Sequence, residues 1–485
     1  MIKLPDLTLS NWKENLTKKN FTALEAVQAY FEEIKNKDKN IGAYLSLHEN
    51  EALKAAEETD LKIAKGEDIH PLAGAPLAIK DNLLVKDLPA TASSKILEDY
   101  VASYDATVIK KLRAAGSVFL GKTNLDEFAM GSSTENSAFK LTRNPHDTKK
   151  VPGGTSGGSA AAIAANMALG ALGTDTGGSI RQPASFCGVV GLKPTYGAVS
   201  RFGAIATASS LDQIGPLTKS VEDAALLFNT IRGQDGYDST STDPGYDENN
   251  LLNPKLENVK KLRVGLPKEY FEDKLDEDVT KAIEKAIEKI KSLGIKFKEV
   301  SLPHTKYALA SYYIINFAEI SSNLARLDGI RYSRRKDALK KAKNLEDFYR
   351  EERGQGFGSE SKRRIILGTY VLSSGYYDAY YAKAQKVRTL LKNDFTNAFK
   401  EVDVILTPTS PSTAFDIGSK TSDPLEMYLS DIFTVTANLA GVPAISIPAK
   451  SDTKMPVGVQ LIGKHFREAD ILGLGHYYEQ LEKKS

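Results

Sequence analysis

The sequence predicts an α/β protein in which helices flank a mixed central sheet. Short apolar runs of strand length alternate along the chain with longer amphipathic helical patterns, as α/β folds require. Of the 485 residues, 41% are hydrophobic and 26% are charged, which is ordinary for a globular protein. The length alone would allow up to three domains, but we expect residues 1–485 to form a single domain with excursions.

Two helices are expected near the start of the chain. Thr22-Ala-Leu-Glu25 is a capping box, and it opens a helix that extends to about Asn36. A second, highly charged helical pattern covers residues 49–65. Further along this half, we expect strands at 76–79 and 117–120 and helices at 106–115 and 221–231.

The second half is predicted to leave the main sheet and return to it. Asp, Ser, Thr, Gly and Asn dominate residues 233–254, which indicates a surface linker. Residues 255–400 then form an excursion, in which apolar residues at i, i+4, i+8 and i+11 from Val279 predict an amphipathic helix that Gly294 ends. Strands are expected in the excursion at 262–265 and 295–300, and in the returning segment 401–485 at 402–406, 444–447 and 457–462.

Two glycine runs that carry serine lie close together. Residues 151–159 read Val-Pro-Gly-Gly-Thr-Ser-Gly-Gly-Ser, and residues 173–181 read Gly-Thr-Asp-Thr-Gly-Gly-Ser-Ile-Arg. Glycine allows backbone N–H groups to form a concave nest, and a nest beside a hydroxyl supplies both a nucleophile and oxyanion donors. A flexible turn is the ordinary explanation of either run. Both runs, however, lie in an apolar stretch on either side of a predicted buried helix at 160–169, which favours an ordered site.

The serine needs a base, and a lysine is a candidate for it. None of the six histidines is near the glycine runs in sequence, whereas Lys80 follows the apolar run 75–79. Most lysines after a strand are solvated. To act as a base, Lys80 must be neutral, so burial must lower its pKa well below the ordinary value of about 10.4. A rival motif, G-x-S-x-G at 154–158, lacks the preceding strand that a nucleophile elbow requires.

Residues 151–197 resemble the amidase signature family, the Ser–Ser–Lys amidohydrolases. Residues 71–82, Pro-Leu-Ala-Gly-Ala-Pro-Leu-Ala-Ile-Lys-Asp-Asn, resemble the lysine-bearing strand of that family. The segments 122–136, 373–381 and 438–443 resemble, within the family, the glutaminase subunits of tRNA-dependent amidotransferases. The resemblance implies the amidase signature fold and places the catalytic core segment at 70–232.

The resemblance also implies roles for individual residues. Ser179 matches the nucleophile and Lys80 the base, and the family spacing puts the bridging hydroxyl on Thr155 where the family has serine. Ser156 remains the alternative if the loop is shifted by one residue. The predicted oxyanion donors are the backbone N–H groups of Thr176, Gly177, Gly178 and Ser179. A structural ion pair with Asp175 is the expected role of Arg181.

A glutamine-binding pocket is implied in the second half of the chain. Arg364 matches a residue that holds the α-carboxylate of glutamine, and a guanidinium suits that group through two parallel hydrogen bonds. Asp431 matches the partner of the α-ammonium group, and Tyr312 or its neighbour Tyr313 is expected to line the same pocket. The other basic residues of 331–364 are explained as a solvated helical face.

The resemblance implies a glutamine-hydrolysing subunit that supplies ammonia for the conversion of Glu-tRNA(Gln) to Gln-tRNA(Gln). No phosphate loop is visible, and a net charge of +2 does not indicate a dedicated nucleic-acid binder. ATP and Mg²⁺ use and tRNA recognition are therefore expected on a partner, the B subunit of the amidotransferase, with a small C subunit, and no cofactor on this chain. A free-standing amidase of small or aryl amides and a non-catalytic scaffold remain as alternatives.

Localisation is expected to be cytoplasmic. The single cysteine, Cys187, rules out an internal disulfide, and the N-terminus lacks the apolar region of a signal peptide. The chain has no uncharged apolar run of 18 residues, so no membrane span is expected.

Overall fold

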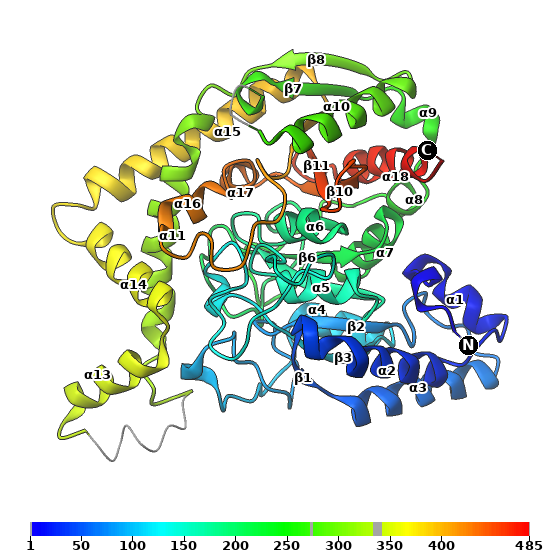
Figure 1. The fold of residues 1–485 in the computed structure, drawn as a ribbon, viewed down its shortest axis with the longest axis horizontal. Coiled ribbons are helices and arrows are strands. Elements are labelled where there is room, and N and C mark those ends of the chain that lie inside the picture. The colour runs from blue at the N-terminus through cyan, green and yellow to red at the C-terminus, as the bar shows by residue number, and fades with distance from the viewer. Residues whose placement is uncertain (1, 272–274, 333–341, 485) are drawn as a thin grey trace.

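An 11-stranded mixed sheet extends through the molecule in the order β1-β3-β2-β4-β6-β5-β10-β11-β9-β7-β8 (Figure 1). The computed structural model describes residues 2–271, 275–332 and 342–484. The strands are β1 (Tyr44–Leu47), β2 (Pro76–Lys80), β3 (Val118–Thr123), β4 (Gly170–Asp175), β5 (Val190–Lys193), β6 (Gln213–Thr218), β7 (Arg263–Pro267), β8 (Lys296–Val300), β9 (Val404–Pro408), β10 (Ala444–Ala449) and β11 (Val457–Gly463). Strand β2 is parallel to both β3 and β4, whereas β4 and β6 are antiparallel, as are β10 and β11.

Helices flank this sheet, as the sequence predicts. In the first half they are α1 (Leu9–Thr17), α2 (Ala23–Ile41), α3 (Glu49–Ala64), α4 (Thr107–Ala114), α5 (Gly157–Ala164), α6 (Arg181–Cys187) and α7 (Val221–Ile231). In the second half they are α8 (Glu248–Leu252), α9 (Leu256–Val259), α10 (Glu277–Ser292), α11 (Ala308–Asn323), α13 (Leu345–Gly356), α14 (Ser359–Leu372), α15 (Lys383–Glu401), α16 (Pro424–Leu429), α17 (Val435–Ala440) and α18 (Glu468–Lys484).

Local sequence signals account for several helix boundaries. The predicted capping box forms at the start of α2, where Thr22 Oγ1 accepts from Glu25 N at 3.1 Å and the Glu25 carboxylate accepts from Thr22 N at 2.8 Å. Ser220 caps α7 in the same way, by accepting from Asp223 N at 3.1 Å. These side chains satisfy backbone N–H groups that have no partner inside the first turn of a helix.

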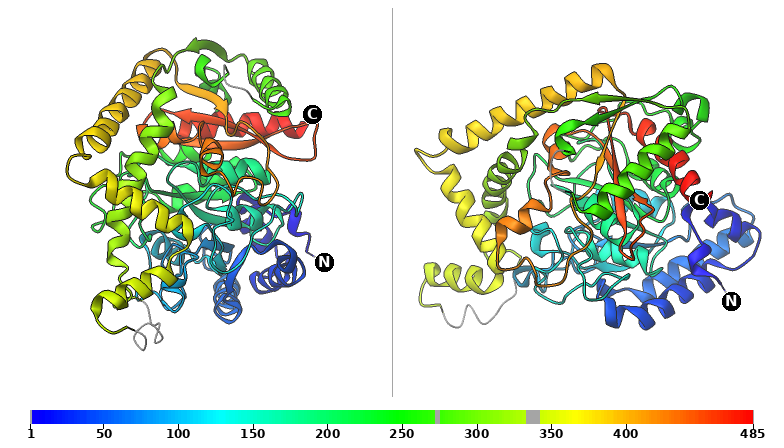
Figure 2. Two further views of the ribbon diagram at one scale, coloured as in Figure 1. Left: turned by 60° about the vertical axis from the view of Figure 1, so that its left-hand side comes forward. Right: turned by 45° about the horizontal axis from the view of Figure 1, so that its top comes forward.

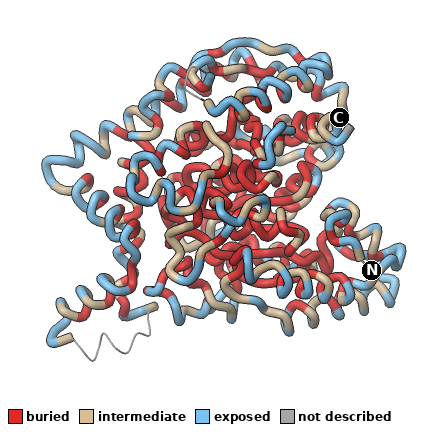
Figure 3. The backbone as a smooth tube through the Cα atoms, viewed as in Figure 1, coloured by how far each residue is buried: buried red, intermediate tan, exposed pale blue. Residues whose placement is uncertain are grey.

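The protein has a buried sheet region and a more exposed helical arm. Helices α5 and α6 pack on each other and on the central strands, and α7 and α18 form a second such pair. Buried residues concentrate around the sheet, whereas α13, α14 and α15 carry much of the exposed chain (Figures 2 and 3). Strands β7 and β8 belong to the same sheet and lie at one of its edges, next to β9. The predicted excursion, residues 255–400, therefore adds two strands to the sheet before its long helices begin.

The sequence patterns missed some strands. Expected strands match β2, β3, β7, β8, β9, β10 and β11 to within a few residues, but β1, β5 and β6 were not expected. Strands β5 and β6 contain Gly191 and Gly215-Pro216, which ordinarily indicate turns, although here both strands are fully buried and lie between neighbouring strands of the sheet. The predicted linker contains the short helix α8, and the basic residues within 333–341 lie outside the described chain.

Candidate active site

Lys80 lies at the end of β2 with its ammonium group fully buried among oxygen atoms. Its Nζ is 2.7 Å from Thr155 Oγ1, 2.9 Å from Ser156 Oγ and 2.8 Å from Thr174 Oγ1. The strand ends here because the next residues turn away, and β4 places Thr174 beside it. The sequence therefore brings Lys80 to the first glycine run, as the resemblance implies.

The electrostatic environment of Lys80 favours a neutral amine. Burial lowers the pKa of Lys80 to about 7, against the opposing effect of the nearby carboxylates of Asp126, Asp175 and Asp212. Desolvation dominates because a charged ammonium loses its hydration in a dry interior. A large fraction of the molecules therefore carry a proton acceptor at this position at neutral pH.

The two hydroxyls beside Lys80 differ in what their protons can reach. Ser156 Oγ donates to the carbonyl of Thr174 at 3.1 Å, so its proton is already engaged by the backbone of β4. Thr155 Oγ1 contacts Lys80 Nζ, and its proton has no other acceptor among the described residues. The structure thus brings both candidate relay hydroxyls to the lysine but leaves only the Thr155 proton unengaged.

Ser179 lies against the same loop and carries an unengaged hydroxyl. The carbonyl of Ser179 accepts from Ser156 N at 3.0 Å, and no hydrogen bond ties its hydroxyl to any described residue. Ser179 is 8% exposed, so the hydroxyl can be reached from outside. Among the described residues, the N–H groups of Gly177 and Ser179 likewise make no hydrogen bond.

One predicted oxyanion donor requires a correction. The N–H of Gly178 donates to Asp175 Oδ1 at 2.9 Å. Because the carboxylate at the end of β4 already accepts this hydrogen bond, the N–H of Gly178 is not free to bind an oxyanion. The other three remain predicted donors. Thr176 is itself fixed by its hydroxyl, which donates to Asp212 Oδ1 at 2.7 Å.

A buried ion pair fixes this loop. Arg181 Nε and Nη2 each lie 3.0 Å from an Asp175 oxygen, and Nη1 donates to Gln460 Oε1 at 2.6 Å on β11. Asn438 on α17 bonds to both partners. Burial alone would raise the pKa of Asp175, but the adjacent Arg181 guanidinium holds it at about 2. The expected structural role of Arg181 is therefore observed.

Tyr312 on α11 borders the nest. A Cβ added at Gly177 would come within 2.4 Å of the Tyr312 hydroxyl, so that position has no room for a side chain. The neighbouring Tyr313 points elsewhere and donates from its hydroxyl to Asp431 Oδ2 at 2.9 Å. Consecutive tyrosines of one helix thus reach the nest and Asp431.

Asp431 is a buried carboxylate with two hydroxyl donors. Ser132 Oγ donates to Asp431 Oδ2 at 2.7 Å, in addition to the Tyr313 hydroxyl. Burial raises the pKa of Asp431 to about 7. A cationic group bound next to it would favour the ionised form.

Arg364 faces the same tyrosine from α14. Its Nε donates to Glu360 Oε1 at 2.7 Å and its Nη1 to Asn316 Oδ1 at 3.1 Å. The guanidinium carbon lies 5.5 Å from the centre of the Tyr313 ring, and Nη2 makes no hydrogen bond to a described residue. Tyr313 therefore contacts Asp431 through its hydroxyl, while a planar cation with unengaged N–H donors lies near its ring.

Asp431 is connected to the nest. Thr434 Oγ1 donates to the carbonyl of Gly177 at 2.6 Å and also lies 3.0 Å from the carbonyl of Asp431. The structure therefore brings together the predicted residues of both halves of the chain. Their roles stay predictions, since geometry alone assigns none of them.

Sequence reasoning missed several residues of the site. Thr174 was within the second glycine run, and its position one residue before Asp175 in a strand could have indicated it. Thr434 and Ser132 gave no local signal, because each becomes important only through contacts far away in sequence. Glu360 precedes Arg364 by four residues, a spacing that places the two side chains on one helix face and could have indicated their pairing.

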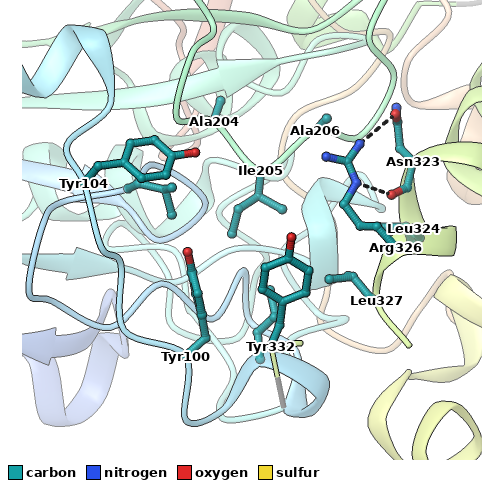
Figure 4. A pocket seen from close by; sticks show the side chains of 12 residues that line it. Tyr100, Tyr104, Ala204, Ile205, Ala206, Asn323, Leu324, Arg326, Leu327 and Tyr332 are labelled. Atoms are coloured by element: carbon teal, nitrogen blue, oxygen red, sulfur yellow. Dashed lines mark hydrogen bonds between the residues drawn. The ribbon is translucent and has the colours of Figure 1, made fainter. Parts of the chain in front are cut away.

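A separate cavity of about 120 Å³ lies between Tyr100, Tyr104 and Tyr332 (Figure 4). Arg326 at its edge is held by Asn323. None of the predicted site residues lines this cavity. In the part of the chain that the structure describes, no group of three or more His, Cys, Asp or Glu residues could hold a metal ion, and no helix has the length and apolar character to cross a membrane.

Comparison with known proteins now identifies the family. The sequence pattern named Amidase matches residues 25–472. The chain belongs to the amidase family. The resemblance inferred from the glycine runs and the predicted fold class are thereby confirmed.

Relatives of the family cover almost the whole chain. The A subunit of glutamyl-tRNA(Gln) amidotransferase from Carboxydothermus hydrogenoformans is 58% identical over 96% of this chain and 95% of its own length. The crystal structure of the Thermotoga maritima protein of that name has a TM-score of 0.82 at 42% identity and covers 99% of this chain and 96% of its own. Peptide amidase from Stenotrophomonas maltophilia has a TM-score of 0.84 at 28% identity, over 99% of this chain and 98% of its own.

The buried ion pair generates a prediction about stability. Asp175→Asn keeps the shape of the side chain but leaves the Arg181 charge unpaired, which should reduce the free energy of unfolding by about 3–5 kcal/mol. The control is Asp416→Asn, because Asp416 is an exposed residue that pairs with Lys150 at 3.1 Å, and it should change stability by less than about 1 kcal/mol. Denaturant unfolding measures both, and equal effects would contradict the assignment.

Proposed function

We propose that this chain is the glutamine-hydrolysing component of a tRNA-dependent amidotransferase. It releases ammonia from glutamine, and the ammonia is used to convert Glu-tRNA(Gln) to Gln-tRNA(Gln). The observation that carries this proposal is the cluster of Lys80 with Thr155 and Ser179, in a site that also contains a cation and a carboxyl group, Arg364 and Asp431, both next to Tyr313. Relatives that align with this chain over nearly their whole length are named as that component.

The first half of the reaction forms an acyl-enzyme. Neutral Lys80 takes the proton of Thr155, which takes the proton of Ser179, and Ser179 Oγ attacks the side-chain amide carbon of glutamine. The negative charge moves to the amide oxygen, where the N–H groups of Gly177 and Ser179 stabilise it, with Thr176 as a further predicted donor. The proton returns through Thr155 to the leaving nitrogen, so ammonia departs and a glutamyl ester remains on Ser179.

The second half restores the enzyme. A water molecule gives its proton to the same relay and attacks the ester carbon, and collapse of the oxyanion breaks the bond to Ser179 Oγ. Glutamate leaves and Ser179 recovers its proton. In each half of the reaction, Lys80 thus first accepts a proton and then returns it. A pKa of about 7 suits this dual role, because the amine can both gain and lose a proton near neutral pH.

The charged residues supply the preference for glutamine. The unengaged N–H groups of Arg364 can hold the α-carboxylate, and Asp431 can hold the α-ammonium, while the amide end reaches the nest next to Tyr312. A simple or aryl amide lacks the two charged groups of glutamine, so it would gain no contact with the unengaged N–H groups of Arg364 or with the buried Asp431 carboxyl. This supports glutamine hydrolysis over a general amidase.

Activation and tRNA recognition belong to partner proteins in this proposal. The B subunit of the amidotransferase uses ATP and Mg²⁺ and contacts most of the tRNA, and the C subunit is the small third component. This chain needs no cofactor of its own, and the complex operates in the cytoplasm.

The nucleophile assignment tests the proposed function. In the complex with the B and C subunits, Ser179→Ala should abolish glutamine hydrolysis, because it removes the hydroxyl that forms the acyl-enzyme. ATP-dependent amidation of Glu-tRNA(Gln) with free ammonium chloride should continue, since the partner active site is intact. Glutamate release and Gln-tRNA(Gln) formation measure the two reactions. A Ser179→Ala complex that still hydrolysed glutamine would overturn the mechanism.

The relay assignment separates two neighbouring hydroxyls. Thr155→Val keeps the shape but removes the hydroxyl, and it should lower kcat by on the order of 10²-fold or more. Thr155→Ser restores the hydroxyl and should retain activity. Ser156→Ala should have the smaller effect, because the Ser156 proton is engaged by the Thr174 carbonyl at 3.1 Å. If Ser156→Ala were the more damaging change, Ser156 would be the relay.

The pH dependence tests the state of Lys80. Only the neutral amine accepts a proton, so kcat should rise with pH through about 7 and level off above it. Saturating glutamine is used, because the carboxyl group of Asp431 has a pKa in the same range and affects binding. Lys80→Arg should be as inactive as Lys80→Ala, since arginine stays protonated. Substantial activity in Lys80→Arg would show that the lysine acts only through its charge.

A further inference from the structure

Two adjacent buried carboxylates, Asp126 and Glu127, have no role in the chemistry proposed above. They follow β3 in the segment 122–136, and both side chains are almost fully buried. Neither side chain makes an ion pair with a described residue, and each instead accepts several hydrogen bonds from a different part of the chain. Those hydrogen bonds lead to the two residues predicted to hold the amino-acid end of glutamine, Arg364 and Asp431.

Glu127 fixes the start of α14. Its Oε2 accepts from Gly358 N at 2.8 Å and from the Ser361 hydroxyl, and its Oε1 accepts from the Ser94 hydroxyl. Gly358 is the N-cap residue, and the Glu127 carboxylate accepts from its N–H as the acidic residue of a capping box would, but from outside the helix; its negative charge also suits the N-terminus of a helix. Arg364 lies less than two turns further along the same helix.

Asp126 fixes the loop that leads to Asp431. Its Oδ2 accepts from Thr134 N at 2.8 Å and its Oδ1 from Asn136 N at 2.8 Å. Thr134 has a left-handed backbone with φ of 64°, a conformation that a non-glycine residue adopts only when surrounding contacts hold it. The same loop carries Ser132, which donates to Asp431 at 2.7 Å.

We infer that Asp126 and Glu127 are positioning residues that together set the separation between Arg364 and Asp431, the predicted partners of the α-carboxylate and the α-ammonium of glutamine. Asp126 and Glu127 are neighbours in the sequence. The start of α14 and the 131–136 loop are therefore both anchored to the same short piece of backbone. Neither residue touches the substrate. Glu127 acts through α14 and Arg364, and Asp126 acts through Ser132 and Asp431. This inference rests on the proposed glutamine-binding roles of Arg364 and Asp431.

Glu127→Gln tests the Arg364 end. The amide keeps the size of the side chain but presents an N–H donor where Gly358 N–H or a serine hydroxyl needs an acceptor, so α14 should shift. In the complex, KM for glutamine should rise about 10-fold, the effect of one charge-assisted hydrogen bond, with kcat within about twofold. Should this variant fold poorly, Ser361→Ala removes one of the three donors to Glu127 and should raise KM in the same direction by less.

Two glutamine analogues distinguish the ends when used as competitive inhibitors. 4-Carbamoylbutanoate keeps the carboxylate but lacks the amino group, and 4-aminobutanamide keeps the amino group but lacks the carboxylate. Glu127→Gln should weaken inhibition by the first only, and Asp126→Asn by the second only. Inhibition constants are compared for Asp126→Asn because the Asp126 charge also acts on Lys80.

Glu269→Gln is the matched control. The Glu269 carboxylate also accepts from a serine hydroxyl and from a backbone N–H, that of Leu302 at 2.9 Å, but near β7 and β8. It should leave KM for glutamine unchanged. In an Arg364→Ala background, Glu127→Gln should raise KM no further, because its effect passes through Arg364.

The outcomes separate this inference from the proposed function. A fall in kcat at unchanged KM, equal weakening of both analogues, or additive effects with Arg364→Ala would show that Glu127 only stabilises the fold. Those results leave glutamine hydrolysis through Ser179 standing. A wild-type complex that did not hydrolyse glutamine would overturn both.

Discussion

The ion pair between Asp175 and Arg181 is the interaction on which the remainder of the site depends. Asp175 ends β4, accepts from the N–H of Gly178, and pairs with an arginine that reaches Gln460 on β11 and Asn438 on α17. A loop rich in glycine would otherwise sample many conformations. The Asp175–Arg181 pair holds the loop in one conformation. Its partners Gln460 and Asn438 come from the second half of the sequence.

A dry interior then determines the chemistry available to Lys80. The amine is surrounded by hydroxyl and carbonyl oxygens, with carboxylates near but not in contact. A carboxylate in direct contact would hold the ammonium charged and remove its basicity. The distance between Lys80 and the nearby aspartates is therefore as important as burial, because it allows desolvation to prevail.

The sequence predicted the chemistry of the site better than its details. Lys80 and Ser179 could be proposed because an apolar strand and a glycine nest are local patterns and because the resemblance to the amidase signature family implies roles for these two positions. The sequence could not predict which of Thr155 and Ser156 has a free hydroxyl proton. That depends on the hydrogen bond from the Ser156 hydroxyl to the Thr174 carbonyl. Gly178 was misjudged because a nest pattern does not tell which N–H groups a nearby carboxylate will occupy. Thr434 and Ser132 depend on contacts far away in sequence, which no local pattern contains.

The fold was predictable in its class and in most strands, and less so at its centre. Strands β5 and β6 carry the glycine and proline residues that usually mark turns, yet the sheet encloses them on both sides. Such strands are specified by their neighbours rather than by their own alternation of side chains. The same dependence on tertiary contacts explains why the helices of the arm were expected only as a region.

The contact between α11 and α14 has a consequence for protein engineering. A Cβ added at Gly368 of α14 would lie 1.9 Å from the carbonyl oxygen of Phe317 on α11, so the two helices touch through their backbones. Helix α11 carries Tyr312 and Tyr313, and α14 carries Arg364. Neither helix can be exchanged alone for that of another amidase without breaking this contact. The transferable unit is the pair, and a chimera built for a new amide substrate must move both helices together.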